Sequence, residues 1–228
     1  MISDKLKEVE KIIEKKCSEC GRNRSDIVLI AVSKTQPVDV LLQAVDAGIR
    51  SFGENKAKEL QNKSESISGD FKWHFIGHLQ TNKVKYIINC SEYIHSVDSI
   101  KLAEEINLKA ISLGKKQKIL LEIKTSNEIA KLGIESESEI YKTAEFCKNA
   151  ENLDLVGLMT MAPFTNEKNI IRNCFIKLRD IKEKLNNSGF DLRELSMGMT
   201  NDYEMAIEEG ATMLRIGTAI FGEKIINK

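Results

Sequence analysis

The sequence has little proline and tryptophan, no net charge and no long apolar run. Two prolines and one tryptophan occur in 228 residues, and 34 Lys and Arg balance 34 Asp and Glu. Because a balanced chain has no overall attraction for nucleic acid or anionic lipid, neither partner is expected. No stretch approaches the roughly 18 to 20 apolar residues of a membrane helix, and the charged start MISDKLKEVEKIIEKK does not resemble a secretory signal. We therefore expect a soluble, cytoplasmic protein.

Cysteines are few and odd in number. With five, a monomer cannot pair them all in disulfides, so a reducing compartment is expected. Cys17 and Cys20 form a C-x-x-C motif, but a zinc site needs a second pair of ligands, and the other cysteines stand singly. Four cysteines extend apolar helical stripes: Cys17, Cys20, Cys147 and Cys174. We expect these four to be small buried side chains, and we expect no bound metal.

Short runs rich in Val, Ile and Leu alternate with longer stretches in which apolar residues recur every three or four positions. This alternation is typical of repeated strand and helix units. A further helix, with apolar residues at helical spacing from Ile2 to Cys20, precedes the first run. The expected strands are residues 27–32, 50–53, 73–77, 93–97, 118–124, 153–159, 194–198 and 213–217.

Eight strands, each followed by a helix, are typical of a (β/α)₈ TIM barrel, a fold of roughly 250 residues. The runs IVLIAV and KILLEI are apolar on both faces, as expected for parallel strands covered by helices. No linker rich in Pro, Gly or Ser divides the chain, so we predict one α/β barrel domain over residues 1–228, with an extra N-terminal helix. An open doubly wound sheet is the alternative.

In such a barrel the active face lies at the carboxyl ends of the strands, so the residues after each run are candidates. Lys34 follows the first run and shares the parity of Ile30 and Val32, which places the three on one strand face. Loss of hydration at that position would favour the free amine, which can attack a carbonyl. A lysine that snorkels to solvent is the alternative.

The last two strands are followed by segments suited to a phosphate. SMGMT and RIGTAIFG combine glycines, hydroxyls and helix N-termini, which together bind phosphate monoesters. The general rule for barrels also places a phosphate site after strands seven and eight. A reactive lysine on the first strand would lie across the barrel closure from these segments. The pairing suits an aldehyde that carries a phosphate, such as pyridoxal 5'-phosphate (PLP).

Six motifs resemble those of the pyridoxal phosphate homeostasis protein family: AVSKT, FGEN, WHFIGHLQTNK, IHSVDS, GLM and LSMGMTNDYEMAIEEGATMLRIGTAIFG. The resemblance runs from about Ile27 to Gly222. It implies a barrel like the N-terminal domain of bacterial alanine racemase, with PLP bound as a Schiff base on Lys34. It also implies a role in intracellular vitamin B6 homeostasis and amino-acid balance without classical catalysis, with PLP-dependent apoenzymes as candidate partners.

The same resemblance assigns roles to residues around the lysine. Arg215 would face the pyridine nitrogen, Asn55 would lie beside the ring, and His78 would lie near the mouth of the site. The phosphate would be held by Ser196, Gly217 and Thr218, with Met199 and Thr200 nearby.

Arg215 also bears on catalysis. A guanidinium only donates hydrogen bonds, so it would leave the pyridine nitrogen neutral and the ring a weak electron sink. A racemase of this fold also needs a second base, a tyrosine from a separate domain, and the chain has no expected counterpart. The sequence therefore favours a cofactor carrier, expected to be a monomer. The alternatives are a PLP-dependent amino-acid racemase and an aldolase-like lysine enzyme.

Two lysines depart from the family pattern. Lys56 stands where an aromatic residue is usual, and Lys124 stands where asparagine is common. We expect both to be solvated charges at the rim of the pocket; attraction of phosphate and a second amine for the aldehyde are the alternatives. His74, within an apolar strand, is expected to be a hydrogen-bonded core histidine. The methionines of GLMTM and SMGMT are expected to contact the cofactor ring.

Overall fold

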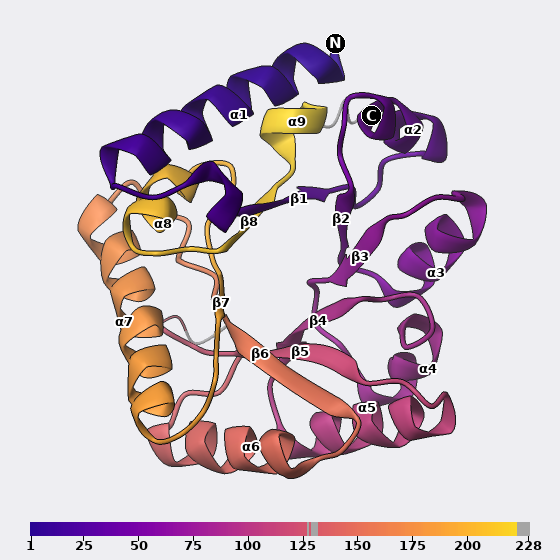
Figure 1. Cartoon of the computed structure of the whole chain (residues 1–228), viewed down its shortest axis with the longest axis vertical. Helices are drawn as coiled ribbons and strands as arrows, with labels where there is room; N and C mark the ends of the chain where they lie inside the picture. The colour runs from indigo at the N-terminus through magenta and orange to yellow at the C-terminus, as the bar shows by residue number, and fades with distance from the viewer. Residues whose placement is uncertain (127, 129–131, 223–228) are drawn as a thin grey trace.

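The computed structural model describes residues 1–126, 128 and 132–222. Its strands pair in parallel in chain order, and the last pairs with the first, so the sheet closes into a barrel (Figure 1). The strands are β1 (Val28–Val32), β2 (Ser51–Glu54), β3 (Lys72–Phe75), β4 (Tyr93–Val97), β5 (Gln117–Glu122), β6 (Leu153–Met159), β7 (Glu194–Ser196) and β8 (Met213–Ile216). Each strand begins and ends within two residues of its predicted range. The pairing of β1 with β8 confirms the barrel and excludes the open sheet.

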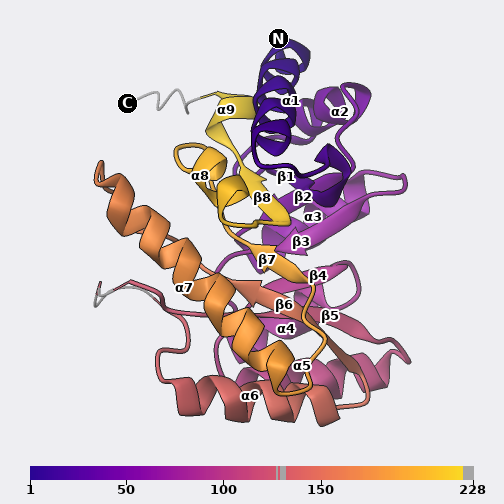
Figure 2. The same ribbon diagram turned by 60° about the vertical axis from the view of Figure 1, so that its left-hand side comes forward.

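Helices cover the outside of the barrel, as Figures 1 and 2 show from two sides. They are α1 (Ile2–Glu19), α2 (Val38–Asp46), α3 (Ala57–Ser66), α4 (Val84–Ile87), α5 (Ile100–Ser112), α6 (Glu137–Asn149), α7 (Lys168–Asn187), α8 (Tyr203–Glu208) and α9 (Thr218–Phe221). Short 3₁₀ turns lie at Arg24–Asp26 and Thr81–Lys83. The predicted extra helix is α1, which packs against α8 and α9.

The apolar face of α1 is largely as predicted. Leu6, Val9, Ile13 and Cys17 are buried on it. The expectation that Cys20 is buried is wrong, because the helix ends at Glu19 and Cys20 turns away from the stripe as the exposed C-cap. The remaining two cysteines of the apolar stripes, Cys147 and Cys174, are buried as predicted.

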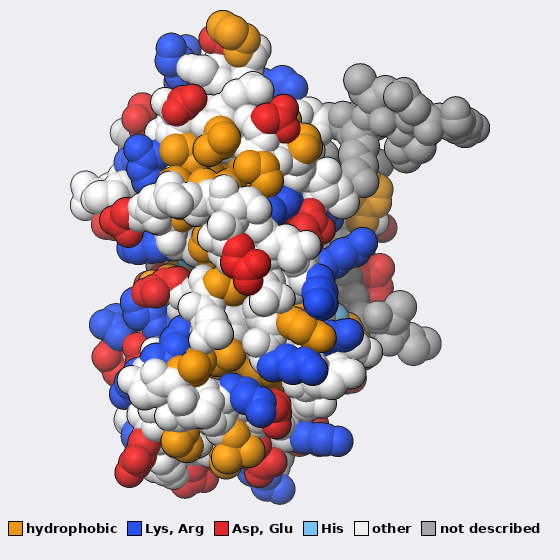
Figure 3. Space-filling view, turned by 90° about the vertical axis from the view of Figure 1, so that its right-hand side faces the viewer, with side chains coloured by type: hydrophobic (Ala, Val, Ile, Leu, Met, Phe, Trp, Pro, Cys, Tyr) orange, Lys and Arg blue, Asp and Glu red, His pale blue; other side chains and the backbone are white. Residues whose placement is uncertain are grey.

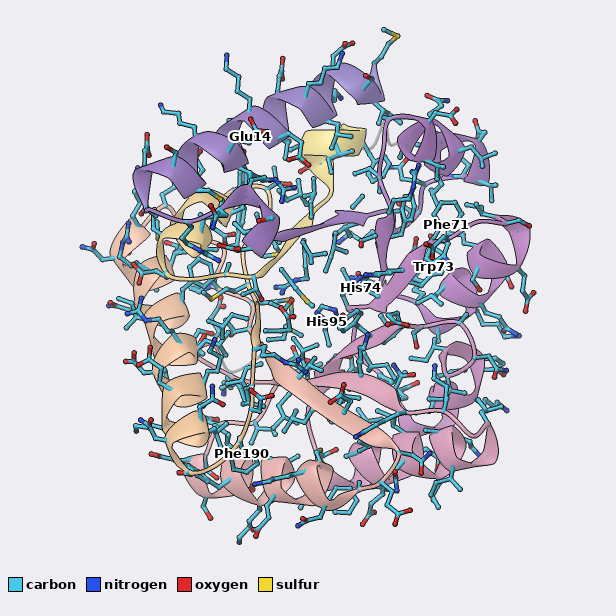
Figure 4. All side chains as sticks on the ribbon, in the orientation of Figure 1. Glu14, Phe71, Trp73, His74, His95 and Phe190 are labelled. Carbon is cyan, nitrogen blue, oxygen red and sulfur yellow. The ribbon has the colours of Figure 1, made fainter. Side chains whose placement is uncertain are left out.

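Apolar side chains form two separate clusters. The larger cluster joins the helices to the outer face of the strands. The smaller consists of residues from β1, β5, β6 and β8, which meet across the barrel interior: Ile30, Leu120, Val156, Met159 and Met213. Neighbouring residues of one strand go to opposite sides, since side chains alternate along a strand. In Figure 4, Trp73 of β3 lies on the outer side toward α3, whereas His74 lies inside the ring of strands.

The surface carries charges of both signs. In Figure 3, which shows the right-hand side of Figure 1, basic and acidic side chains lie among apolar ones. Within residues 1–126, 128 and 132–222, no helix is both long and apolar enough to cross a membrane. In the same part of the chain, no three His, Cys, Asp or Glu side chains are grouped to hold a metal ion.

Candidate functional site

A cavity of about 660 Å³ opens at the carboxyl ends of the strands. Its walls come from the segments that follow β1, β2, β3, β6, β7 and β8, so loops far apart in the sequence meet here. The lining residues are Val32, Lys34, Asn55, Ile76, residues 161–166, Lys168, Ile171, residues 199–202, Met205, Arg215, Gly217 and Thr218. The cavity therefore lies where the barrel rule places an active face.

Seven of the eight residues predicted to bind the cofactor lie on this wall: Lys34, Asn55, Met199, Thr200, Arg215, Gly217 and Thr218. Ser196 is the exception among the described residues. It is fully buried at the end of β7 and lies beneath Arg215, to which it is hydrogen-bonded. The structure thus brings together residues of the first and last strands, because β1 and β8 pair directly.

Lys34 lies in the turn that follows β1. As the parity predicted, Val32 and Lys34 face the same cavity, while Ile30 is buried inside the barrel. The expectation that Lys34 has lost its hydration is wrong: its side chain is exposed. The cause is its place one residue beyond the buried Ser33, in a turn closed by the hydrogen bond from the Gln36 amide to the Ser33 carbonyl.

Arg215 forms a buried, fixed part of the wall. It comes from β8, and its side chain donates through Nη1 to the Ser196 hydroxyl at 2.6 Å and through Nη2 to the Thr160 carbonyl at 2.8 Å. Burial lowers the pKa of the guanidinium to about 10, so it stays protonated at neutral pH. Since two of its nitrogens are engaged below the wall, its orientation is fixed before any ligand binds.

A neutral hydrogen-bonded chain lies behind Arg215. Ser196 Oγ is 2.9 Å from His95 Nδ1, and His95 Nε2 is 2.9 Å from His74 Nδ1. Both imidazoles are fully buried inside the barrel (Figure 4). Burial lowers the pKa of His74 to about 3 and that of His95 well below its usual range, so both rings are neutral. We call Ser196, His95 and His74 the histidine chain.

One tautomer of each imidazole gives every contact in the histidine chain one donor and one acceptor. Arg215 donates to Ser196 Oγ, and the serine hydroxyl donates to His95 Nδ1. In the same arrangement His95 donates from Nε2 to His74 Nδ1. His74 Nε2 has no hydrogen-bond partner among the described residues, and its ring stacks on Tyr93 with centroids 4.7 Å apart. His74 is therefore a buried histidine, as predicted, but within the described part of the chain it is hydrogen-bonded at Nδ1 only.

Hydroxyl groups from the last two loops meet at the cavity. Thr218 Oγ1 donates to Thr200 Oγ1 at 3.1 Å, and the Ala219 amide approaches the same Thr200 oxygen at 3.5 Å. Gly217 precedes them, and a Cβ there would lie 3.3 Å from the Val32 carbonyl oxygen of β1. Glycine therefore allows β8 to end close against β1, and the adjacent hydroxyls can donate to an anion.

Methionines alternate between the cavity and the core. Met161 and Met199 line the cavity, whereas Met159 and Met197 are buried below. One methionine of each pair is therefore placed where it can contact a ligand, and the contact with the cofactor ring stays a prediction. The sequence reasoning missed Phe164 and Lys168, which line the cavity from the segment after β6. Their position beyond a strand end is the signal that could have found them.

Three further residues named from the sequence lie away from the cavity wall. His78 is exposed, with Nδ1 3.7 Å from Asp98 Oδ2. Lys124 pairs with Glu135 at 3.0 Å, and Lys56 is exposed at the N-terminus of α3. Among the described residues that line the cavity, none of the three occurs.

Glu122 is a buried acid near this site that the sequence reasoning also missed. It ends β5 and is 3% exposed. Burial, followed by the nearby Asp98, raises its pKa to about 7, although Arg215 acts in the opposite direction. The carboxyl is therefore partly protonated at neutral pH.

Known proteins are similar in sequence to this chain over almost its whole length. Residues 20–224 match the family described as alanine racemase, N-terminal domain. A pyridoxal phosphate homeostasis protein from Aquifex aeolicus is 39% identical over 223 residues, 97% of each chain. A human protein of the same name is 37% identical over 213 residues, which cover 88% of this chain and 78% of the human one.

Solved structures share the fold. PipY of Synechococcus elongatus PCC7942, solved with PLP bound, is 31% identical with a TM-score of 0.84 over 97% of this chain and 100% of its own. A protein from Bifidobacterium adolescentis is 34% identical with a TM-score of 0.90 over 96% of this chain and 94% of its own. An alanine racemase of Clostridium difficile 630, 17% identical, has a TM-score of 0.77 over 98% of this chain and 58% of the racemase, which shows a common fold. The chain therefore belongs to the pyridoxal phosphate homeostasis protein family, built on the fold of the alanine racemase N-terminal domain.

Proposed function

We propose that this chain binds PLP as a Schiff base on Lys34 and acts in intracellular PLP homeostasis without classical catalysis. One observation carries the proposal: a single cavity wall presents the Lys34 amine beside Arg215, Gly217 and Thr218. An amine, a donor-only cation and paired hydroxyls match the aldehyde, the pyridine nitrogen and the phosphate of PLP. PipY, a relative with the same fold, is solved with PLP bound, and the curated relatives carry the homeostasis name.

Each group has a defined task in this proposal. The Lys34 amine attacks the aldehyde carbon, and the carbonyl oxygen leaves as water. Thr200 donates its hydroxyl hydrogen to the phosphate, and Thr218 does the same by giving up its hydrogen bond to Thr200. Gly217 keeps the space beside them open, and Met199 lies nearby. Asn55 lies beside the ring. The resemblance implies a phosphate contact for Ser196, but its buried place under Arg215 supports a positioning role instead.

Two features support a carrier over a racemase. Arg215 keeps its protons and only donates, so it leaves the pyridine nitrogen neutral and weakens the ring as an electron sink. A racemase also needs a base on each face of the reacting carbon. Among the described residues that line the cavity, no tyrosine occurs. Transfer of PLP to apoenzymes, a monomeric state and a cytoplasmic location stay predictions.

The test is the site of attachment. We expect the purified protein to give a visible imine absorption band with PLP, and borohydride reduction to leave a pyridoxyl group on Lys34. Lys34→Ala should abolish the band, whereas the matched variant Lys124→Ala should retain it, because Lys124 is paired with Glu135 away from the cavity. An adduct confined to Lys56, Lys124 or Lys131, the last outside the described residues, would contradict the assignment.

A separate assay addresses catalysis. The PLP-loaded protein is incubated with single enantiomers of alanine and other amino acids, and the opposite enantiomer is quantified by chiral chromatography. We expect no sustained turnover. Continued racemisation that disappears in Lys34→Ala would establish the racemase alternative, and absence of any visible band with PLP would favour the aldolase-like alternative.

A further inference from the structure

The turn that carries Lys34 has an unfavourable backbone conformation. Thr35 has a φ of 65°, and it is the one non-glycine residue with positive φ among those the structure describes. A β-branched side chain rarely adopts this region, because its substituents crowd the backbone. Such a conformation persists only where surrounding contacts hold it, so the turn needs support from its neighbours.

Three charged residues from β2 and α3 provide that support. Glu54 ends β2, while Glu59 and Lys63 lie one turn apart on α3. We call these three residues the ion clamp. All three approach the residues on either side of Lys34, while the side chain of Lys34 itself remains exposed.

The contacts of the ion clamp fall on both neighbours of Lys34. The Ser33 hydroxyl donates to Glu54 Oε1 at 2.6 Å, and Lys63 Nζ donates to the Ser33 carbonyl at 2.7 Å. On the other side, the Thr35 amide donates to Glu59 Oε1. The backbone before and after Lys34 is thus tied to two different elements, β2 and α3.

Lys63 is the centre of the ion clamp. Its ammonium also donates to Glu54 Oε1 at 2.7 Å and to Glu59 Oε1 at 2.8 Å, so its three hydrogens have three acceptors. Lys63 is 6% exposed and Glu54 is fully buried. A buried ion pair often stabilises a fold no more than apolar residues of the same size. The ion clamp is therefore better explained by its contacts with the Lys34 turn than by stability of the fold alone.

The pKa values of the two carboxyls of the ion clamp are shifted in opposite directions. Burial raises the pKa of Glu54 despite the hydrogen bonds from Lys63 and Ser33. Burial acts in the same direction on Glu59, but hydrogen bonds from Lys63 and from the Thr35 amide outweigh it, so the pKa of Glu59 is lowered. The hydrogen bond from the Thr35 amide thus stabilises the ionised form of Glu59.

We propose that Lys63, with Glu54 and Glu59, is a positioning residue that fixes the strained Lys34 turn and so presents the amine to the cavity. The inference rests on the proposed role of Lys34 as the amine that binds PLP. Lys63 acts through the backbone of Ser33 and Thr35, and it does not line the cavity itself. Its removal should therefore slow the reaction of Lys34 more than it weakens contacts with the phosphate.

The test is the rate at which the full-length protein forms its imine band after rapid mixing with PLP. We expect Lys63→Met to slow this rate between roughly 10- and 100-fold, since misplacing a reacting group by about 1 Å has effects of that order. The matched control is Lys58→Met, on the same helix but exposed and packed on Tyr86 at 4.5 Å. It should react at the wild-type rate.

A second substitution separates positioning from general damage. Glycine adopts a φ of 65° without strain, so Thr35→Gly should restore most of the rate in the Lys63→Met background. Damage to the barrel would not be repaired by this change. If Lys63→Met does not fold, Glu59→Ala decides in its place, because it removes the acceptor for the Thr35 amide and should slow the reaction several-fold in a way that Thr35→Gly again repairs.

Two results would overturn the inference. One is a wild-type rate in Lys63→Met, or in Glu59→Ala where that variant decides. The other is failure of Thr35→Gly to restore the rate of imine formation in the variant that decides, Lys63→Met or Glu59→Ala. Both differ from failure of the proposed function, in which the wild-type protein forms no imine or carries the pyridoxyl label on another residue.

Discussion

Lys34 and Arg215 lie on the same cavity wall, but the protein supports them in opposite ways. Lys34 is held through its neighbours Ser33 and Thr35 by the ion clamp of β2 and α3. Arg215 is held through its side chain by the neutral histidine chain inside the barrel. Under the proposed function, the Lys34 amine must react and needs a free side chain, whereas Arg215 must only orient a ring and needs a fixed one. The ion clamp accordingly leaves the Lys34 side chain free, and the histidine chain holds the Arg215 side chain in place.

The chemistry of the two supports follows from their surroundings. Inside the barrel, burial keeps His74 and His95 neutral, and an imidazolium there would also repel Arg215. In the ion clamp, opposite charges lie 2.7 and 2.8 Å apart and compensate one another. Losing one member should therefore cost more in the ion clamp than in the histidine chain.

The largest expected effect on stability is that of Lys63→Met. It leaves the fully buried Glu54 without its cation, and breaking a buried pair in this way costs about 3 to 5 kcal/mol in the free energy of unfolding. Urea denaturation measures the change. Glu54→Gln in the same background should recover part of it. If Lys63→Met lowers the free energy of unfolding by no more than Ser196→Ala does, the ion clamp and the histidine chain do not differ in this way.

Glu122→Gln should stabilise the protein in a pH-dependent way. The folded pKa is raised from 4.5 to about 7, so the ionised carboxylate destabilises the fold increasingly as pH rises through that window. The amide should therefore add about 3 kcal/mol at pH 8, at about 1.4 kcal/mol per pKa unit, and nothing at pH 4.

Urea titrations at several pH values measure the effect of Glu122→Gln. The exposed Asp191→Asn serves as the control and should show no such dependence. A gain of equal size at pH 4 and pH 8 would show that the carboxylate charge is not responsible.

Ser196→Ala should have a moderate effect. It removes the acceptor of Arg215 Nη1 and the partner of His95 Nδ1, both buried, and unsatisfied groups of this kind cost about 1 to 3 kcal/mol. Thermal or urea unfolding measures the loss, with the exposed Ser66→Ala as control. If the two serine variants unfold alike, the histidine chain does not hold Arg215.

The smallest expected effect is that of Lys184→Ala. Its ion pair with Glu137, at 3.1 Å, is exposed on both sides. Solvent screens such a pair, so the free energy of unfolding should change by less than about 0.5 kcal/mol. Both variants remove a charge pair, but only Lys63 is buried, so comparing them separates the effect of burial from that of charge pairing. A loss in the free energy of unfolding at Lys184 as large as that at Lys63 would contradict this explanation.

Local pattern predicts the strands and the cavity well. Runs such as IVLIAV and LDLVGLM mark buried parallel strands, and the rule that sites follow strand ends brings Lys34, Asn55 and Gly217 to one wall. The exposure of Lys34 and of Cys20 was mispredicted, because each lies just past the end of an element and its direction depends on the turn that follows.

The two supports could not be predicted from spacing. Lys63 reads as an ordinary helix lysine, and only the packing of α3 beside β1 and β2 brings it to Ser33. Likewise, His95 meets Ser196 across the barrel interior, from strands far apart in the sequence. The motif predicts that Ser196 holds a phosphate, and this stays a prediction. The burial of Ser196 beneath Arg215 could not be predicted from the motif, because it depends on the closed barrel.

Closure of the barrel between β1 and β8 has a consequence for biosynthesis. Lys34 is synthesised well before Arg215, so the two halves of the proposed site cannot meet on a chain that does not yet include β8. A nascent chain thus exposes its lysine long before it can hold a ligand there. Under the proposed function, binding of PLP would then show that the barrel has closed, and excess PLP should favour molecules that include β8 over those that lack it.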